Sequence, residues 1–352
     1  MSSPSLVAVG TALPPHYVEQ ERLIAALRTL WAGKHHNADR IDQLHRAVRV
    51  SGRHLALPME QYLELDTFQK QNDAWIRAAT DLGEAALHDA LARANMKPEE
   101  LDHIFVATVT GIATPSIDAR LANRMGLRAD VKRTPLFGLG CVAGAAGTAR
   151  ASDTLRAFPK QTAALLSVEL CSLTLQRSDL SIQNVIASGL FGDGAAALII
   201  AGGERARRGP EVLASRSALY PDSERVMGWD VTDGGFKVVL SAQVPEIIRS
   251  HIRRDVDAFL RDHGLTRRDV RHWVSHPGGP KILDAVAEAL ELPREALRLT
   301  WDSLEKVGNL SSASVLFVLR DTLDQVDAKP GDHGLMLAMG PGFCSELVLL
   351  RW

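Results

Sequence analysis

Cys141 has the side chain and the local sequence of a nucleophile. It follows a Gly-Leu-Gly turn and precedes VAGAAGTARASDTLRAF, a run of mostly small residues that predicts a helix. Unpaired N–H groups and the positive end of the dipole at a helix start stabilise a thiolate, so we expect the pKa of Cys141 to be lowered. The alternative interpretation is a small residue that is buried at a crowded helix start.

His276 and Asn309 are the partners that thiol chemistry would need. His276 ends an apolar strand pattern and precedes a stiff Pro-Gly-Gly-Pro turn, and a neutral imidazole there can accept the thiol proton. A histidine at a strand end also occurs as a hydrogen-bonded structural residue. Asn309 opens a second predicted helix, where its amide either caps the helix or donates a hydrogen bond to a developing oxyanion.

Two competing motifs give these residues no role. GLGCVA at residues 138–143 satisfies the G-x-G-x-x-A pattern of dinucleotide-binding loops, with Glu169 as the acid that would bind a ribose. Pro135 interrupts the strand that should precede this loop, which disfavours it. No G-x-S-x-G occurs, so a serine hydrolase of that type is also disfavoured. The pair His35-His36 lies in a polar stretch and predicts exposed surface.

The elements that must position the three candidates occur twice along the chain. A long helical pattern runs into the apolar strand LDHIFVATVTG, and a second, from Val244 to Leu260, runs into VRHWVSHPGG. The helix after Cys141 has its counterpart after Asn309, roughly 170 residues later, and each half closes with a Gly turn and an apolar strand. The sequence therefore predicts an α/β fold of two similar halves, residues 1–204 and 205–352, whose pseudo-twofold packing would bring Cys141, His276 and Asn309 together.

Composition excludes several classes of protein. The 352 residues carry 40 Lys and Arg against 42 Asp and Glu, a formal net charge of −2, so a nucleic-acid partner is not expected. No apolar run reaches the roughly 18 residues of a membrane span, and the start lacks a signal-peptide pattern, so we expect a cytoplasmic protein without a membrane span. The three cysteines, Cys141, Cys171 and Cys344, form no C-x-x-C pair and predict neither a disulfide framework nor a metal site.

The segments GLGCVAGAAG, VSHPGGPKILDAV and GNLSSASVLFVL, in this order, resemble the type III polyketide synthases of the chalcone synthase superfamily, and LFGDGAAALI and MGPGF add two more motifs. The resemblance covers nearly the whole chain. It implies a thiolase fold, a duplicated five-layered α/β/α/β/α architecture, in a homodimer. It also implies that a starter acyl-CoA acylates Cys141, and that His276 and Asn309 hold malonyl-CoA as it loses CO₂, with no metal or redox cofactor. An enolate formed in this way needs positioned hydrogen-bond donors.

The same resemblance assigns residues to a substrate cavity. Phe191 would gate the passage between a CoA tunnel and this cavity, although an ordinary core aromatic beside a turn explains it too. Cys171 and Thr174 would line the cavity, and Gly342 and Phe343 would approach it from the C-terminal loop.

Three positions depart from the plant pattern. Val238 stands where plant enzymes have a second gating Phe, Met339 replaces a Phe, and Thr114 replaces a Met that crosses the dimer interface. Smaller and aliphatic walls favour an alkyl starter over an aromatic one. We therefore expect a medium- or long-chain acyl-CoA starter and an alkylpyrone or alkylresorcinol product, as in the bacterial branch of the family.

CoA carries phosphates that cations bind. Residues of the predicted CoA site are Arg46, Arg49 and Arg53, where plant relatives have a basic cluster, and Gly278, Gly279 and Lys281 at the tunnel mouth. A solvated basic face explains the arginines equally well.

Three other functions stay open. A synthase of the tetrahydroxynaphthalene type would use malonyl-CoA alone, and Cys171 supports it. An enzyme like ketoacyl synthase III would condense once, with an acyl carrier protein, but LFGDG and CVAGAAG disfavour it. A non-catalytic acyl-CoA-binding protein of the same fold is disfavoured by the intact Cys141, His276 and Asn309.

Overall fold

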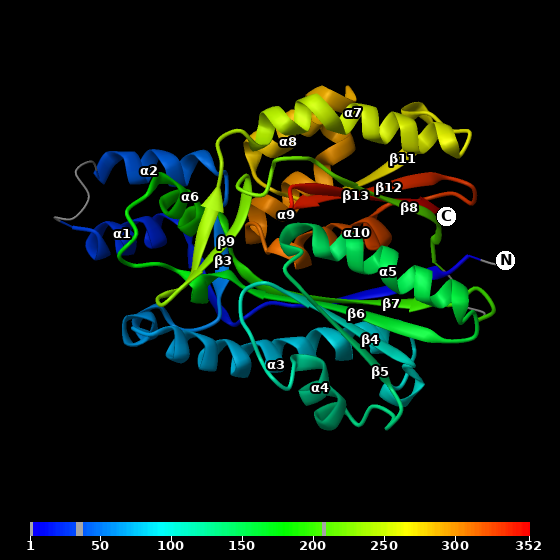
Figure 1. Ribbon diagram of the computed structural model, residues 1–352, viewed down its shortest axis with the longest axis horizontal. Helices are drawn as coiled ribbons and strands as arrows, with labels where there is room; N and C mark the ends of the chain where they lie inside the picture. The colour runs from blue at the N-terminus through cyan, green and yellow to red at the C-terminus, as the bar shows by residue number, and fades with distance from the viewer. Residues whose placement is uncertain (1–2, 33–37, 206–208) are drawn as a thin grey trace.

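The apolar strands and small-residue helices that the sequence predicts stack in layers around a mixed β-sheet (Figure 1). The computed structural model describes residues 3–32, 38–205 and 209–352, so the pair His35-His36 lies outside the described residues. Within these ranges no helix combines the length and the apolar character that crossing a membrane requires.

The sheet has two parts that meet edge to edge. Their strand order is β11-β12-β13-β8 followed by β1-β7-β6-β4-β5, and a single residue pair, Ser5 and Glu211, joins β1 to β8. The strands of the first part are β1 (Ser5–Ala12), β4 (His103–Thr108), β5 (Lys132–Phe137), β6 (Thr162–Leu170) and β7 (Asp193–Ala201). Those of the second part are β8 (Glu211–Leu219), β11 (Val270–Ser275), β12 (His333–Gly340) and β13 (Cys344–Arg351). Each part therefore belongs to one of the two halves predicted from the internal repeat.

Helices fill three further layers. The outer faces are covered by α3 (Phe68–Arg93) and α4 (Ile117–Met125) on one side and by α7 (Val244–Asp262) and α8 (Pro280–Leu290) on the other. Between the two parts of the sheet lie α5 (Ala143–Ala157) and α10 (Ser314–Gln325). This is the five-layered α/β/α/β/α thiolase fold that the sequence predicts.

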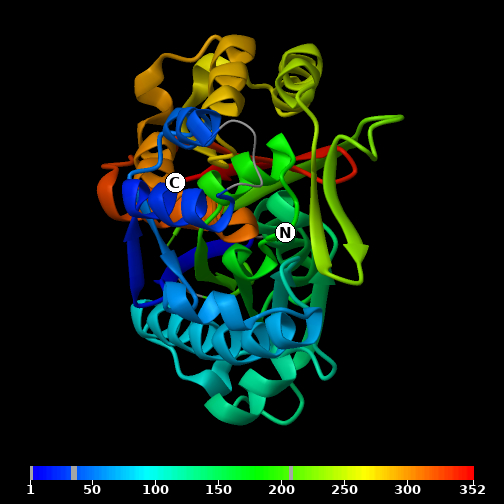
Figure 2. The same ribbon diagram turned by 90° about the vertical axis from the view of Figure 1, so that its left-hand side faces the viewer.

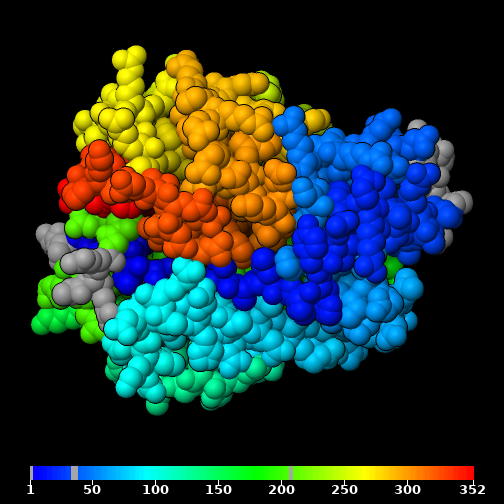
Figure 3. Space-filling view, turned by 180° about the vertical axis from the view of Figure 1, so that it is seen from behind, coloured from blue at the N-terminus to red at the C-terminus, as the bar shows by residue number. Residues whose placement is uncertain are grey.

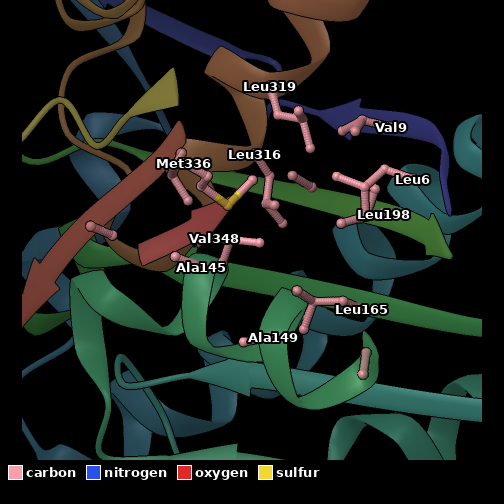
Figure 4. Packing of buried hydrophobic residues seen from close by; sticks show 14 of the residues in the cluster. Leu6, Val9, Ala145, Ala149, Leu165, Leu198, Leu316, Leu319, Met336 and Val348 are labelled. Carbon is pink, nitrogen blue, oxygen red and sulfur yellow. The ribbon is translucent and has the colours of Figure 1, made fainter. Parts of the chain in front are cut away.

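The core follows from the alternation of side chains along buried strands. In β7, Leu198 and Ile200 join the cluster around the inner helices, whereas Ile199 joins the cluster beneath α3. Figure 4 shows the inner cluster, in which Leu165 and Leu198 of the sheet pack near Leu316 of α10. Both faces of β6 and β7 are buried, which explains why their sequences are continuously apolar.

Small residues let the two inner helices approach closely. A Cβ on Gly144 would lie 2.4 Å from the carbonyl oxygen of Ser312 and 2.5 Å from a methyl of Val315. The 3₁₀ turn η3 (Gly140–Val142) leads into α5, and η7 (Ser311–Ala313) leads into α10. The contact between the helices therefore brings the segments that carry Cys141 and Asn309 together.

The remaining elements gather at one end of the molecule, on the left in Figure 1. They are α1 (Gln20–Leu30), α2 (Ala38–Ala47), α6 (Ile182–Leu190), α9 (Arg298–Val307), the hairpin of β2 (His16–Glu19) and β3 (Gly52–Leu55), and the hairpin of β9 (Met227–Thr232) and β10 (Gly235–Leu240). Figure 2 shows the β9–β10 hairpin, in yellow-green, standing apart from the main sheet. From behind, the N-terminal elements, in blue, cover this end (Figure 3).

One local expectation is wrong. Pro135 does not interrupt the strand before Cys141, because it lies within β5, opposite Val106. β5 is the edge strand of its part of the sheet, and an edge strand tolerates a residue that lacks an N–H.

Candidate active site

Cys141 lies in η3, between β5 and α5, and is 8% exposed. Its Sγ is 3.7 Å from the Oγ of Ser311. Gly140 precedes it with a φ of +56°, and a Cβ there would lie 2.7 Å from Pro341. Glycine at this position lets the chain turn tightly beside the C-terminal loop and presents the sulfur to the interior.

His276 follows β11 directly, and its main-chain N–H donates to the carbonyl of Leu337 in β12 (2.9 Å). The side chain is buried, and neither ring nitrogen has a hydrogen-bond partner among the described residues. Buried polar atoms are rarely left unpaired, so an imidazole of this kind is suited to pair with a bound substrate.

Asn309 caps the turn that follows it, and its amide nitrogen faces the site. Its Oδ1 accepts a hydrogen bond from the N–H of Ser311 (2.8 Å), as a capping residue does, and this bond fixes the orientation of the amide. Its Nδ2 has a long contact, 3.4 Å, with the carbonyl of Gly278, and the side chain also hydrogen-bonds the thiol of Cys141. The amide thus has a positioned donor for a ligand oxygen.

Cys141, His276 and Asn309 line one cavity of about 300 Å³, named here the front chamber. Met339, Phe343 and Phe191 also line it. Gly278, Gly279 and the exposed Lys281 contribute to its wall at the start of α8, so a cation stands where the chamber meets solvent.

Burial opposes charge on both the sulfur and the imidazole. It raises the pKa of the Cys141 thiol to about 12; the hydrogen bond with Ser311 opposes this effect, and the nearby Glu169 adds to it. Burial also lowers the pKa of His276 to about 3. The lowered pKa expected for Cys141 is therefore wrong for the free chain. In the free chain both groups are therefore neutral at neutral pH.

Glu169 and Ser311 lie at the site, although the sequence analysis named Glu169 only as a ribose-binding acid and did not name Ser311. Glu169 is the penultimate residue of β6, and its Oε2 accepts hydrogen bonds from the N–H of Val109 (3.1 Å) and the hydroxyl of Thr110 (2.9 Å). Its Oε1 accepts from the hydroxyl of Ser312, next to Ser311. It is fully buried, which raises its pKa. Glu169 thus anchors the turn that carries Ser311 and is not placed to bind a ribose.

A second cavity, of about 420 Å³, lies behind the first and is named here the rear chamber. Cys171, Thr174 and Val238 line it, together with Trp229, which the sequence analysis missed. Apolar residues of α1, β3 and the 3₁₀ helix that follows β3 form one side of the wall, namely Leu23, Leu27, Leu30, Leu55, Met59 and Leu63. Phe191 lines both chambers and therefore forms a partition between them.

Thr114 and Gly342 line neither chamber within this chain. Thr114 lies on an exposed turn before α4. Gly342 has a φ of +143°, and a Cβ there would lie 3.1 Å from Leu219. The side chain that reaches the front chamber from this loop is that of Phe343.

The three predicted CoA-binding arginines have different surroundings. Arg46 is exposed and pairs with Glu21 (2.9 Å), and the guanidinium of the exposed Arg49 lies 5.5 Å from the ring centre of Trp301. Neither lines the front chamber. Arg53 is only 1% exposed, because strand alternation in β3 turns it inward, so it is not available to a phosphate at the surface.

His45 of α2 packs against α6 and hydrogen-bonds to it. It is fully buried, its Nε2 lies 2.8 Å from the carbonyl of Val185, and burial lowers its pKa to about 4 from the ordinary 6.5. Between these two pH values the unfolded chain binds a proton that the folded chain does not, so stability is present above pH 6.5 and is lost as the pH falls towards 4.

We expect His45→Gln, which keeps a donor for Val185, to flatten the decline in thermal stability between pH 6.5 and pH 4 by on the order of 2 kcal/mol. Melting temperatures followed by circular dichroism across this range measure the effect. The control is His88→Gln on the exposed face of α3, which should keep the parental profile. An unchanged slope in His45→Gln would contradict the assignment.

Among the described residues, no group of three or more His, Cys, Asp or Glu side chains is arranged to hold a metal ion.

Comparisons with known proteins agree along the whole chain. The family model of the chalcone and stilbene synthases, N-terminal domain, matches residues 2–204, and that of the C-terminal domain matches residues 211–352. A 1,3,6,8-tetrahydroxynaphthalene synthase of Streptomyces peucetius subsp. caesius is 51% identical over 351 residues, 99% of this chain and 93% of the relative. A putative chalcone synthase of Bacillus subtilis (strain 168) is 36% identical over 358 residues, 99% of this chain and 98% of the relative.

A solved structure gives the same result for the fold. The 1,3,6,8-tetrahydroxynaphthalene synthase of Streptomyces coelicolor A3(2), a bacterial type III polyketide synthase, matches with a TM-score of 0.94 at 31% identity, covering 99% of both chains.

Proposed function

Because the chain belongs to the chalcone and stilbene synthase family and is a type III polyketide synthase, we propose that it uses malonyl-CoA as both starter and extender and forms 1,3,6,8-tetrahydroxynaphthalene. The 51% identity to a tetrahydroxynaphthalene synthase over 99% of the chain carries this proposal. It replaces the alkyl starter as the leading function.

In the proposed reaction the Sγ of Cys141 attacks the thioester carbonyl of a CoA substrate, the thiol proton passes to His276, and CoA leaves as a thiol. A second malonyl-CoA then loses CO₂, and the electron pair of the broken C–C bond moves into an enolate. The N–H of a neutral His276 and the Nδ2–H of Asn309 are the donors for its oxygen. The enolate carbon attacks the acyl group on Cys141, forms the new C–C bond and releases the sulfur.

The proposal needs no cofactor other than the CoA thioesters. Lys281, Gly278 and Gly279 at the mouth of the front chamber would bind the CoA arm. We also propose a homodimer in which a second copy covers the turn of Thr114, because this turn is exposed together with the neighbouring Ile112.

The rear chamber favours one second candidate, an alkyl-primed synthase that makes alkylpyrones or alkylresorcinols. Its wall is rich in leucine, and Val238 leaves room where an aromatic residue would fill it. An alkyl chain buries well in such surroundings.

Incubation with malonyl-CoA alone, followed by mass spectrometry of the products, tests the proposal. We expect one major product with the ten carbons of a naphthalene ring, and little change when octanoyl-CoA is added in equal amount. A product that carries the octanoyl chain would support the second candidate instead. Release of a product after one condensation would contradict both and favour an enzyme like ketoacyl synthase III.

A further inference from the structure

Phe191, the partition between the two chambers, is held on one side by main-chain hydrogen bonds of its neighbours. The N–H of Asn309 donates to the carbonyl of Leu190 (2.9 Å), and the N–H of Gly192 donates to the carbonyl of Asn309 (3.0 Å). Phe191, between them, pairs with Asn309 as an isolated β-bridge. The backbone of Phe191 is therefore fixed relative to the residue that carries the amide donor.

Arg53 holds the other side. Its Nη1 donates to the carbonyls of Ser188 (2.9 Å) and Phe191 (3.1 Å), and its Nη2 donates to the carbonyl of Gly189. These acceptors lie at the carboxyl end of α6, where carbonyl groups lack partners within the helix and favour a cation. One guanidinium thus joins the end of α6 to the main chain of the partition.

The guanidinium is itself held in place. The Oε1 of Gln20 accepts from Nη2, and the Nε2 of Gln20 donates to the carbonyls of His45 (2.8 Å) and Gly189 (3.1 Å). Burial lowers the pKa of Arg53 to about 10, so the group still carries its charge at neutral pH. A Cβ on Gly192 would lie 2.6 Å from the carbonyl of Val307 and 3.3 Å from the Cβ of Arg53, so this segment has no room to shift.

We propose that Arg53 is the positioning residue of the partition: by fixing the main chain of Phe191, it sets how readily a growing polyketide chain passes from the front chamber into the rear chamber. This inference rests on the proposed function. The front chamber, at about 300 Å³, is at the lower limit of ligand sites, so a chain that grows beyond a few units needs the further 420 Å³ behind Phe191. Arg53 also lines the rear chamber, but its Nη1 and Nη2 donate to main-chain carbonyls and to Gln20, so we assign its effect to the placement of Phe191.

The test is the ratio of long to short products per malonyl-CoA consumed. Arg53→Lys keeps the cation but loses the fork in which Nη1 donates to the carbonyls of Ser188 and Phe191 while Nη2 donates to that of Gly189. We expect the ratio of the longest product to triketide and tetraketide lactones to fall about tenfold, because a misplaced partition lets short chains leave early. A smaller amount of folded enzyme lowers both kinds of product equally, so it does not change this product ratio.

Two further variants make the test decisive. Gln20→Met removes the side chain that holds the guanidinium but leaves Phe191 and Arg53 unchanged. We expect it to lower the product ratio as well. It tests the proposal even if Arg53→Lys does not fold. His45→Gln alters other contacts of the same helix, with the carbonyl of Val185 and the hydroxyl of Ser188, but leaves the Arg53 bonds to the main chain in place, and it should keep the parental ratio.

The possible outcomes distinguish a failure of the proposed function from a failure of the role proposed for Arg53. Parent enzyme that forms no extended product contradicts the proposed function. Parent enzyme that forms products, with Gln20→Met and any folded Arg53→Lys at the parental ratio, overturns the role of Arg53 alone. A ratio that falls equally in His45→Gln would show that any loosening of α6 suffices and would also overturn it.

Discussion

Replacing Cys141 with alanine is expected to abolish chain extension, lowering product formation by at least about 10⁴-fold, because no other group can carry the acyl chain beside the enolate donors. Decarboxylation of malonyl-CoA should remain measurable, since His276 and Asn309 keep their places in the front chamber. Mass spectrometry of condensed products and of acetyl-CoA separates the two steps.

The matched control is Cys344→Ala. Cys344 is half-buried, its thiol contacts the carbonyl of Pro341, and it lines neither chamber. This variant should retain product formation. Condensed product from Cys141→Ala at parental levels would refute the assignment of the nucleophile.

Replacing Asn309 with aspartate is expected to lower the rate constant for malonyl-CoA decarboxylation by about 10²–10³-fold, as the loss of one oxyanion donor does in other enzymes. Aspartate retains an oxygen for the N–H of Ser311, so the turn before α10 keeps its hydrogen bond. It loses the Nδ2–H and places an acceptor where enolate charge develops. Steady-state kinetics of acetyl-CoA formation measure the effect.

The Asn309→Asp result must appear in kcat more than in KM if the donor acts on the transition state. Asn309→Ala is the comparison variant, since it removes the donor and also the capping oxygen. A rate in Asn309→Asp within a fewfold of the parent would show that Asn309 has only its capping role.

The architecture could be predicted from the chain because its signals are local and repeated. The buried strands read as continuous apolar runs, and the segments after Cys141 and Asn309 read as helices, the first of them rich in small residues. These strands and helices occur where predicted, in β7 and β13 and in α5 and α10. Duplication then restricts how the halves can pack, which is why the three candidate residues could be expected at one place.

The electrostatics and the second cavity could not be predicted, because they depend on burial by distant segments. Arg53 is one arginine among several in a basic stretch, and only the packing of β3 against α6 turns it inward. The raised pKa of Cys141 follows from its burial, which outweighs its position before a helix. Trp229 reaches the rear chamber from a hairpin whose docking has no local signature.

The close contact of α5 and α10 has a consequence for how such enzymes diversify. The nucleophile and the amide donor both stand on this inner pair, where Gly144 leaves no volume for change. The walls of the rear chamber, to which our proposal assigns the control of product size, come in part from α1, the β9–β10 hairpin and α6, at the far end of the molecule. Mutations can therefore accumulate in these peripheral segments and yield new products, while the bond-forming machinery is inherited intact.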